Sequence, residues 1–152
     1  MKKFLDLLSS EVGNAFEKAG YEKELGRVTI SNRPDLCEYQ CNGAMAGAKK
    51  YKKAPVMIAN EVAEFLKGSE VFEKAEVVPP GFLNLNVSGE MIQKYLNEMA
   101  SVDKYGVEAP AQPKKIMIDY GGPNVAKPLH VGHLRSAVIG ESIKRICRYN
   151  GH

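Results

Sequence analysis

The 152-residue chain is 44% hydrophobic and 26% charged, a composition typical of globular proteins and unlike that of disordered or fibrous ones. Its net charge of +3 allows a polyanionic partner without requiring one. No apolar run is long enough to span a bilayer, and Asp6 and Glu11 interrupt the N-terminal segment that would otherwise suggest a signal peptide. We therefore expect a cytoplasmic protein without membrane contact.

The first hundred residues favour a small α+β domain. Apolar side chains at three- and four-residue steps predict an amphipathic helix that begins at Phe4 and is terminated by Gly20. The later elements follow in order: strands over 27–31 and 35–41, helices over 44–53 and 55–68, strands over 71–78 and 82–87, and a helix over 88–100 for which Ser88 is the N-cap. Because strands and helices do not alternate regularly, we expect an antiparallel sheet.

The character of the chain changes after Ala100. Residues 101–115 have two prolines, several charges and few apolar side chains, as linkers do. Residues 116–120 (IMIDY) are typical of a buried strand, and a loop then leads into a helix with Asn150-Gly151 as its C-cap. The apolar face of that helix consists of Leu134, Val138, Ile139, Ile143 and Ile146.

One such β-loop-α unit cannot bury both faces of its strand, so the second domain should be incomplete. We expect domains at 1–112 and 113–152.

The three cysteines, Cys37, Cys41 and Cys147, are expected to be reduced thiols. Cys37 and Cys41 have the spacing of half a metal site. No second cysteine or histidine pair stands at ligand spacing, so we expect buried small side chains and no structural metal.

His130 and His133 flank Gly132 where the presumed strand gives way to the helix. An isolated HxxH pattern is more often structural than functional. Here it coincides with the carboxyl end of a presumed strand and with a helix N-terminus, whose free N–H groups attract phosphate. Imidazoles can donate hydrogen bonds to phosphate oxygens, Lys127 adds positive charge, and glycine lets a base or ribose approach the backbone. Such a site suits activation of a carboxylate by adenylation. Glycine destabilises the interior of a helix, so we expect that Gly140 is there to permit close packing of the helix on the strand.

Residues 119–146 (DYGGPNVAKPLHVGHLRSAVIGESIKRI) resemble the nucleotide-binding segment of arginyl-tRNA synthetase, a class I aminoacyl-tRNA synthetase. HVGH matches the class I HxGH motif, which other nucleotidyltransferases share, whereas the flanking PNVAKPL and LRS are specific for the arginine family. EYQCNGAM and PGFLNLNV resemble stretches of that family's N-terminal additional domain. The resemblance covers nearly the whole chain, but the chain covers only the first part of such an enzyme. It implies the start of a Rossmann-like class I catalytic domain after residue 112.

The resemblance also implies roles for individual residues. His130 and His133 would bind ATP phosphates and stabilise the transition state of arginyl-adenylate formation, with Gly132 under the nucleotide and Mg²⁺ accompanying ATP. Many arginyl-tRNA synthetases lack the lysine of the second class I motif, and Lys127 matches a lysine thought to replace it. These three side chains, His130, His133 and Lys127, would be catalytic.

The resemblance also implies which residues would bind arginine. Asp119 and Asn124, together with His133, match positions that contact the arginine substrate, and an acid and an amide suit a guanidinium or ammonium group. Gly121 and Gly122 stand where the family often has serine or alanine, so no hydroxyl contact is expected from them.

The N-terminal domain of this family holds the exposed D-loop corner of tRNA. Phe82 and Asn84, on one face of a predicted strand, match its D-loop-reading positions, and RNA loops are read by aromatic stacking and by amide hydrogen bonds. Without the resemblance, a core Phe82 and a turn Asn84 are equally good interpretations. The basic cluster 49–53 (KKYKK) could contact phosphates, although a solvated helix end is more common. The expected partners are tRNA(Arg), L-arginine and ATP, and no DNA.

Three functions remain open on the residues alone. The leading one is the N-terminal part of an arginine–tRNA ligase, with the 152-residue chain itself inactive and at most a weak binder of tRNA. A small nucleotidyltransferase would carry HxGH near the start of a complete domain, and here the motif lies near the end of the chain. A tRNA-binding module without chemistry is the non-enzymatic alternative.

Overall fold

The computed structural model describes residues 1–122 and 126–152. They form two compact units, Lys2–Glu98 and Met99–His152, with Met1 joined to the second. The predicted boundary between residues 112 and 113 stays a prediction.

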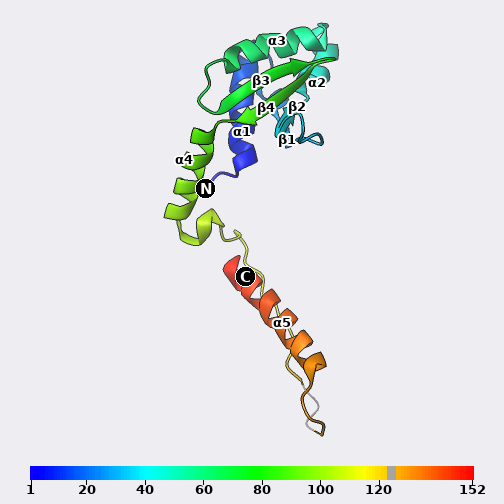
Figure 1. The fold of residues 1–152 in the computed structure, drawn as a ribbon, viewed down its shortest axis with the longest axis vertical. Coiled ribbons are helices and arrows are strands. Elements are labelled where there is room, and N and C mark those ends of the chain that lie inside the picture. The colour runs from blue at the N-terminus through cyan, green and yellow to red at the C-terminus, as the bar shows by residue number, and fades with distance from the viewer. Residues whose placement is uncertain (123–125) are drawn as a thin grey trace. The chain divides into compact units, whose positions relative to one another are not determined.

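The first unit is a four-stranded antiparallel sheet with helices on one face (Figure 1). The strands lie in the order β1-β2-β4-β3, and each pair of neighbours is antiparallel. This confirms the predicted α+β fold. The elements are α1 (Phe4–Lys18), η1 (Lys23–Gly26), β1 (Val28–Ile30), β2 (Tyr39–Cys41), α2 (Gly43–Tyr51), α3 (Pro55–Leu66), β3 (Phe72–Val78) and β4 (Phe82–Val87), followed by α4 (Gly89–Ser101), which runs into the second unit.

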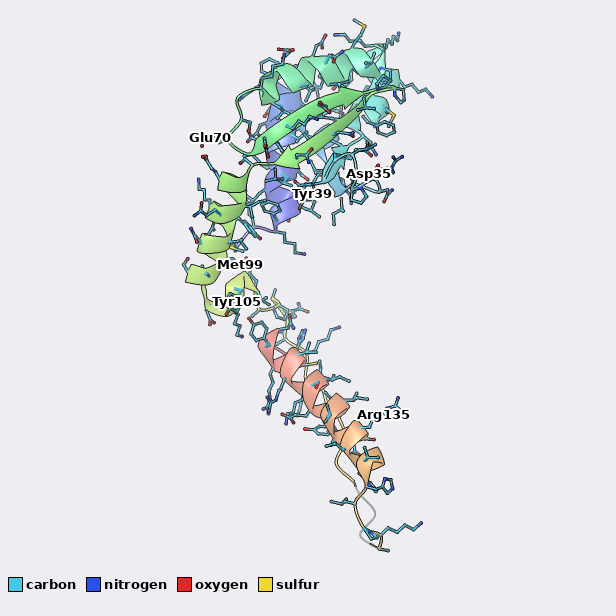
Figure 2. All side chains as sticks on the ribbon, in the orientation of Figure 1. Asp35, Tyr39, Glu70, Met99, Tyr105 and Arg135 are labelled. Carbon is cyan, nitrogen blue, oxygen red and sulfur yellow. The ribbon has the colours of Figure 1, made fainter. Side chains whose placement is uncertain are left out.

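The core of this unit lies between the sheet and helices α1 and α3. Alternation along β4 points Leu83, Leu85 and Val87 to the same side of the sheet. They join a single buried cluster with Leu8, Val12 and Phe16 of α1 and Ile58, Val62 and Leu66 of α3. Burial of each large apolar side chain contributes about 1.5–3 kcal/mol. A shift of β4 by one residue would turn these side chains to the other face, so their burial fixes the strand register. Tyr39 of β2, labelled in Figure 2, packs edge-on against Phe4 with ring centroids 6.2 Å apart.

The strand predicted over 35–41 is shorter than expected, because its first half is a turn. The amides of Leu36 and Cys37 both donate to the carbonyl of Arg33, at 2.9 Å and 3.2 Å. The Arg33 guanidinium and the Asp35 carboxylate pair across the same turn at 2.8 Å. These local bonds compete with strand pairing, so β2 begins only at Tyr39.

Two local signals of the sequence act as predicted. Gly81, in the PPG connection between β3 and β4, has a φ of +156°, and a Cβ there would lie 2.5 Å from Cβ of Pro55. Ser88 caps α4, since its Oγ accepts a hydrogen bond of 3.2 Å from the amide of Met91.

The second unit contains η2 (Asp103–Gly106) and the long helix α5 (Val131–Tyr149). The prediction of a strand over 116–120 is wrong for this structure. A strand needs a hydrogen-bonded neighbour, and in the described part of the second unit no other strand lies beside these residues. The predicted apolar face of α5 is present but exposed, its five side chains being 45–61% accessible. The exposed face agrees with the expectation that this domain is incomplete.

Candidate functional site

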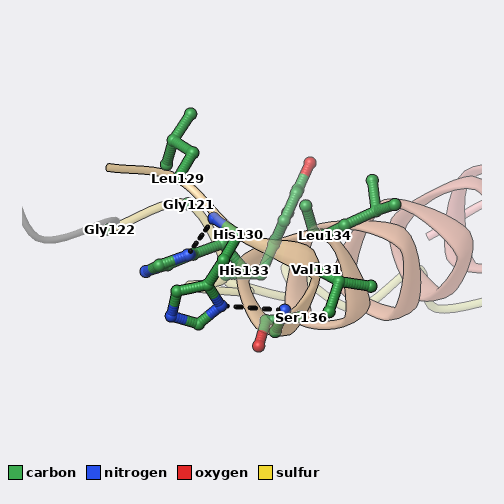
Figure 3. A pocket seen from close by; sticks show the side chains of 11 residues that line it. Gly121, Gly122, Leu129, His130, Val131, His133, Leu134 and Ser136 are labelled. Carbon is green, nitrogen blue, oxygen red and sulfur yellow. Dashed lines mark hydrogen bonds between the residues drawn. The ribbon is translucent and has the colours of Figure 1, made fainter. Parts of the chain in front are cut away.

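The two histidines of the HVGH segment cap the N-terminus of α5. His130 is the N-cap residue, and its Nδ1 accepts a hydrogen bond of 3.1 Å from the amide of Gly132. The amide of His130 in turn donates to Nδ1 of His133, also at 3.1 Å (Figure 3). This is a reciprocal capping box in which imidazoles replace the usual Ser/Thr and Glu/Gln pair. The ring centroids lie 4.1 Å apart, so the motif holds both rings together at the helix start.

The capping hydrogen bonds decide which ring nitrogens remain for a ligand. Because Nδ1 of each ring accepts a backbone proton, Nε2 is the nitrogen that can carry hydrogen and donate. The histidines thus offer two donors where the first amides and the positive end of the helix dipole also favour an anion. His130 is exposed and His133 is half-buried, so a ligand can reach both.

An open cavity of about 660 Å³ lies beside this helix start. Gly121 and Gly122 form one wall and the first two turns of α5 form the other (Figure 3). Its apolar lining suits a flat ring, and the histidines suit an anionic group attached to that ring. The lining residues are Tyr120, Gly121, Gly122, Leu129, His130, Val131, Gly132, His133, Leu134, Ser136 and Ala137.

Tyr120 holds the segment before the cavity against α5. A Cβ added at Gly140 would overlap the Tyr120 side chain and would lie 2.6 Å from its Cδ1, so only glycine allows the ring to pack there. The Tyr120 hydroxyl donates to the Glu141 carboxylate at 2.5 Å. Gly140 does permit close packing, as expected, but against Tyr120 of a segment that is not a strand. The role of Tyr120 was not predicted, although an aromatic residue ending an apolar run was a signal for it.

Glu141 is the centre of a small charge network on α5. Lys144 lies 2.5 Å and Arg145 lies 2.9 Å from its carboxylate oxygens. Hydrogen bonds from Lys144, then Tyr120, then Arg145 lower the pKa of Glu141 from 4.5 to about 2. The carboxylate therefore stays ionised over the whole physiological pH range.

The remaining predicted residues of this site are less closely grouped. Asp119 and Lys127 are both exposed, and neither belongs to the cavity lining. Asn124 lies outside the described residues. The structure therefore brings His130, Gly132 and His133 together with the end of the 116–122 segment.

Phe82 and Asn84 lie on one face of β4, as predicted, and this face is opposite the core. Asn84 is directly opposite Gln40 on β2 and Glu76 on β3, and Gln40 Nε2 donates to Asn84 Oδ1 at 2.9 Å. Phe82 is half-buried and does not belong to the core cluster. No helix of residues 2–98 covers this face of β4 (Figure 1). The contact between Gln40 and Asn84 was not predicted, because no local pattern in the sequence marks it.

The basic cluster 49–53 is partly neutralised within the first unit. Lys50 pairs with Glu22. Lys53 pairs with Glu61, which also accepts a hydrogen bond of 2.5 Å from the Tyr21 hydroxyl. Burial, followed by the hydrogen bond to Glu61, raises the pKa of Tyr21. The cluster therefore serves in part as a structural set of ion pairs.

Neither a metal-binding cluster nor a membrane-spanning helix is present among the described residues. Residues 1–122 and 126–152 contain no group of three or more His, Cys, Asp or Glu side chains arranged to hold a metal ion. Among these same residues, no helix is long and apolar enough to cross a membrane.

Comparison with known proteins gives matches along the whole chain. Residues 4–87 match the family described as arginyl tRNA synthetase N terminal domain, and residues 94–152 match the catalytic domain of class I (R) tRNA synthetases. The chain is 58% identical to an arginine–tRNA ligase from Agathobacter rectalis and 54% identical to one from Alkaliphilus oremlandii. Each match covers 100% of this chain and 26% of the relative, so the chain spans about a quarter of their length.

Solved structures give a similar result. The arginyl-tRNA synthetase of Plasmodium falciparum is 25% identical with a TM-score of 0.58, over 99% of this chain and 29% of that one. The arginyl-tRNA synthetase of Thermus thermophilus is 27% identical with a TM-score of 0.53, over 98% of this chain and 24% of that one.

Proposed function

The chain belongs to the arginyl-tRNA synthetase family, and from that premise we propose that it is the N-terminal part of an arginine–tRNA ligase. Such an enzyme activates L-arginine with ATP to arginyl-adenylate and transfers the arginine to tRNA(Arg). The observation that carries the proposal is the histidine capping box at the start of α5, beside an open cavity.

In the first step a carboxylate oxygen of arginine attacks the α-phosphorus of ATP, and pyrophosphate leaves. Negative charge grows on the phosphate oxygens in the transition state. Nε2 of His130 and Nε2 of His133 can donate to these oxygens, and fixed donors of this kind contribute more in the transition state than in the ground state. Gly132 leaves room for the nucleotide, and Lys127 adds a positive charge. Mg²⁺ would arrive with the ATP phosphates, since Mg²⁺ at such sites is held largely by phosphates and water.

The arginine substrate is assigned to the side of the cavity formed by the 116–122 segment. The Asp119 carboxylate is exposed and can pair with a guanidinium or ammonium group. Asn124 and His133 complete the proposed arginine contacts. Tyr120, the residue after Asp119, is anchored to Glu141 of α5, and this supports the assignment because it holds the backbone of the 116–122 segment beside the cavity.

Binding of tRNA is assigned to the first unit. We assign Phe82 to stacking on an unpaired D-loop base and Asn84 to hydrogen bonding with it. Their location on a sheet face without a covering helix supports this role. The D-loop domain is taken as residues 1–112 and the catalytic segment as 113–152, and the complete enzyme is assigned to the cytoplasm.

The 152-residue chain by itself is assigned a narrower activity. The first unit has its own core, whereas α5 exposes its apolar face. We therefore expect weak, salt-sensitive binding of tRNA(Arg) and no synthesis of arginyl-adenylate. Arginyl-adenylate formation by the purified chain would contradict this.

A chimera tests the catalytic proposal. This chain replaces the matching 26% of the Agathobacter rectalis arginine–tRNA ligase, and attachment of labelled arginine to tRNA(Arg) is measured. His133→Ala should reduce kcat/KM about a hundredfold or more, as expected when one transition-state donor is lost. His152→Ala is the matched control, since His152 follows the C-terminal end of α5, away from the capping box, and its ring contacts only the Lys114 amide among the hydrogen bonds of the described residues. An equal effect of the two substitutions would refute the proposed role of His133.

A further inference from the structure

Gln40 and Asn84 meet on the face of the sheet that no helix of the first unit covers. They are direct partners in the β2–β4 register, and Gln40 Nε2 donates a hydrogen bond of 2.9 Å to Asn84 Oδ1. The two ends of an asparagine amide have nearly the same shape, but one donates and the other accepts. Its hydrogen-bond partners therefore decide which end is presented to a ligand. The donor of Gln40 holds Oδ1 of Asn84 towards β2.

The other end of the amide remains available. Asn84 is only 7% exposed, and its Nδ2 takes part in none of the hydrogen bonds among the described residues. In that same part of the chain, every side-chain nitrogen or oxygen that is shielded from solvent has a hydrogen-bond partner. Nδ2 must therefore reach solvent from the open face. Phe82 lies two residues earlier on the same face, roughly 7 Å away along the strand.

The neighbour on the other side does not compete with Gln40. Glu76, opposite Asn84 on β3, is paired with Lys74 at 2.8 Å. Its carboxylate makes no hydrogen bond to Asn84 in the described structure. Among the described residues, Gln40 is therefore the side chain that holds the Asn84 amide in the orientation seen.

We propose that Gln40 is a positioning residue that makes Asn84 a hydrogen-bond donor towards an unpaired RNA base stacked on Phe82. Gln40 thereby determines which base edges this face accepts. The inference rests on the proposed RNA-binding function of the first unit. It goes beyond that function by assigning the hydrogen-bond polarity of the site to a residue that does not itself contact the base.

A nearly isosteric substitution isolates this role. In Gln40→Glu the new carboxylate can only accept, so Asn84 turns its amide, donates Nδ2 to Glu, and presents Oδ1 to the ligand. The added negative charge also weakens binding of any RNA. Gln93→Glu, on the exposed side of α4, makes the same change of charge away from this face. It is the matched control for the electrostatic part of the effect.

The experiment uses the 152-residue chain and RNA hairpins that differ at one loop base. Two comparisons are made at this loop position: uridine against cytidine, and inosine against adenosine. Within each comparison the exocyclic group and the adjacent ring nitrogen exchange donor and acceptor character. Reversal of the Asn84 amide should therefore change the ratio of the two Kd values by about fivefold or more, the effect of one mismatched hydrogen bond. Gln93→Glu should weaken both hairpins alike and leave the ratio unchanged.

The outcomes separate this inference from the proposed function. Hairpin binding by the wild-type chain with the same base ratio in Gln40→Glu and Gln93→Glu would overturn the role of Gln40 while leaving RNA binding in place. Failure of the wild-type chain to bind any hairpin would overturn both. NMR of the side-chain amides gives a test without RNA. The Nδ2 protons of Asn84 should exchange more slowly with water in Gln40→Glu than in wild type, and unchanged exchange would also overturn the inference.

Discussion

Replacement of Gly140 by alanine tests whether the 116–122 segment is held to α5 through Tyr120. The added methyl group would overlap the Tyr120 side chain, lying 2.6 Å from its Cδ1. The ring cannot remain where it is, and its hydroxyl then loses the 2.5 Å hydrogen bond to Glu141. The substitution should leave α5 helical and release the segment that precedes the cavity.

Two opposing effects set the magnitude. Alanine favours a helix over glycine by about 1 kcal/mol, which stabilises α5 itself. Overpacking at a close contact opposes this by about 1–3 kcal/mol. Every 1.4 kcal/mol is a factor of ten in an equilibrium. The contact between Tyr120 and α5 should therefore weaken by up to about a hundredfold, while the helix content rises slightly.

NMR of the 152-residue chain measures both effects. In Gly140→Ala, nuclear Overhauser contacts between the Tyr120 ring and α5 should disappear, while the chemical shifts of α5 should stay helical. Ser142→Ala is the control, because Ser142 is exposed on the same helix and alanine also raises helix propensity there. Retention of the Tyr120 contacts in Gly140→Ala would refute the packing argument.

The remaining predictions concern pH, thiol reactivity and a turn. Because the pKa of Glu141 is lowered to about 2, the stabilisation from its hydrogen bonds should be complete above pH 4.5 and lost as pH falls towards 2, and an NMR titration of its carboxyl group should have its midpoint near pH 2. Burial raises the pKa of Cys41 to about 11, so at pH 8 only about one thiol in a thousand is ionised, and peptide mapping should find Cys147 alkylated first. Gly81→Ala should reduce the free energy of unfolding by about 1–3 kcal/mol in urea, whereas Gly89→Ala, with open space around it, should not. Equal urea midpoints of unfolding for these two variants would contradict the argument that the turn at Gly81 requires glycine.

Local signals in the sequence identify most of the first unit. The spacing of Leu8, Val12 and Phe16 predicts α1, and the sequence also predicts that Phe82 and Asn84 share one face of β4. The strand order β1-β2-β4-β3 was not predicted. It depends on contacts between residues far apart in the chain, such as Gln40 and Asn84, that no local pattern encodes.

The errors have physical causes. The predicted strand over 35–41 ignores the local pairing of Arg33 and Asp35, which stabilises a turn. The strand predicted over 116–120 needs a neighbouring strand that the described second unit does not provide. Conversely, the HVGH segment was recognised by its sequence, but the use of its histidines as helix caps became evident only from the backbone geometry.

Amino-acid specificity of the chimeric ligase tests the central claim most directly. The chimera carries this chain in place of the matching quarter of the Agathobacter rectalis protein, and it is offered tRNA(Arg), ATP and each amino acid separately. If residues 113–152 form the start of an arginine-activating site, only arginine should become attached to the tRNA. Absence of arginine attachment while the unaltered A. rectalis enzyme is active in the same assay, or attachment of a different amino acid, would contradict the account.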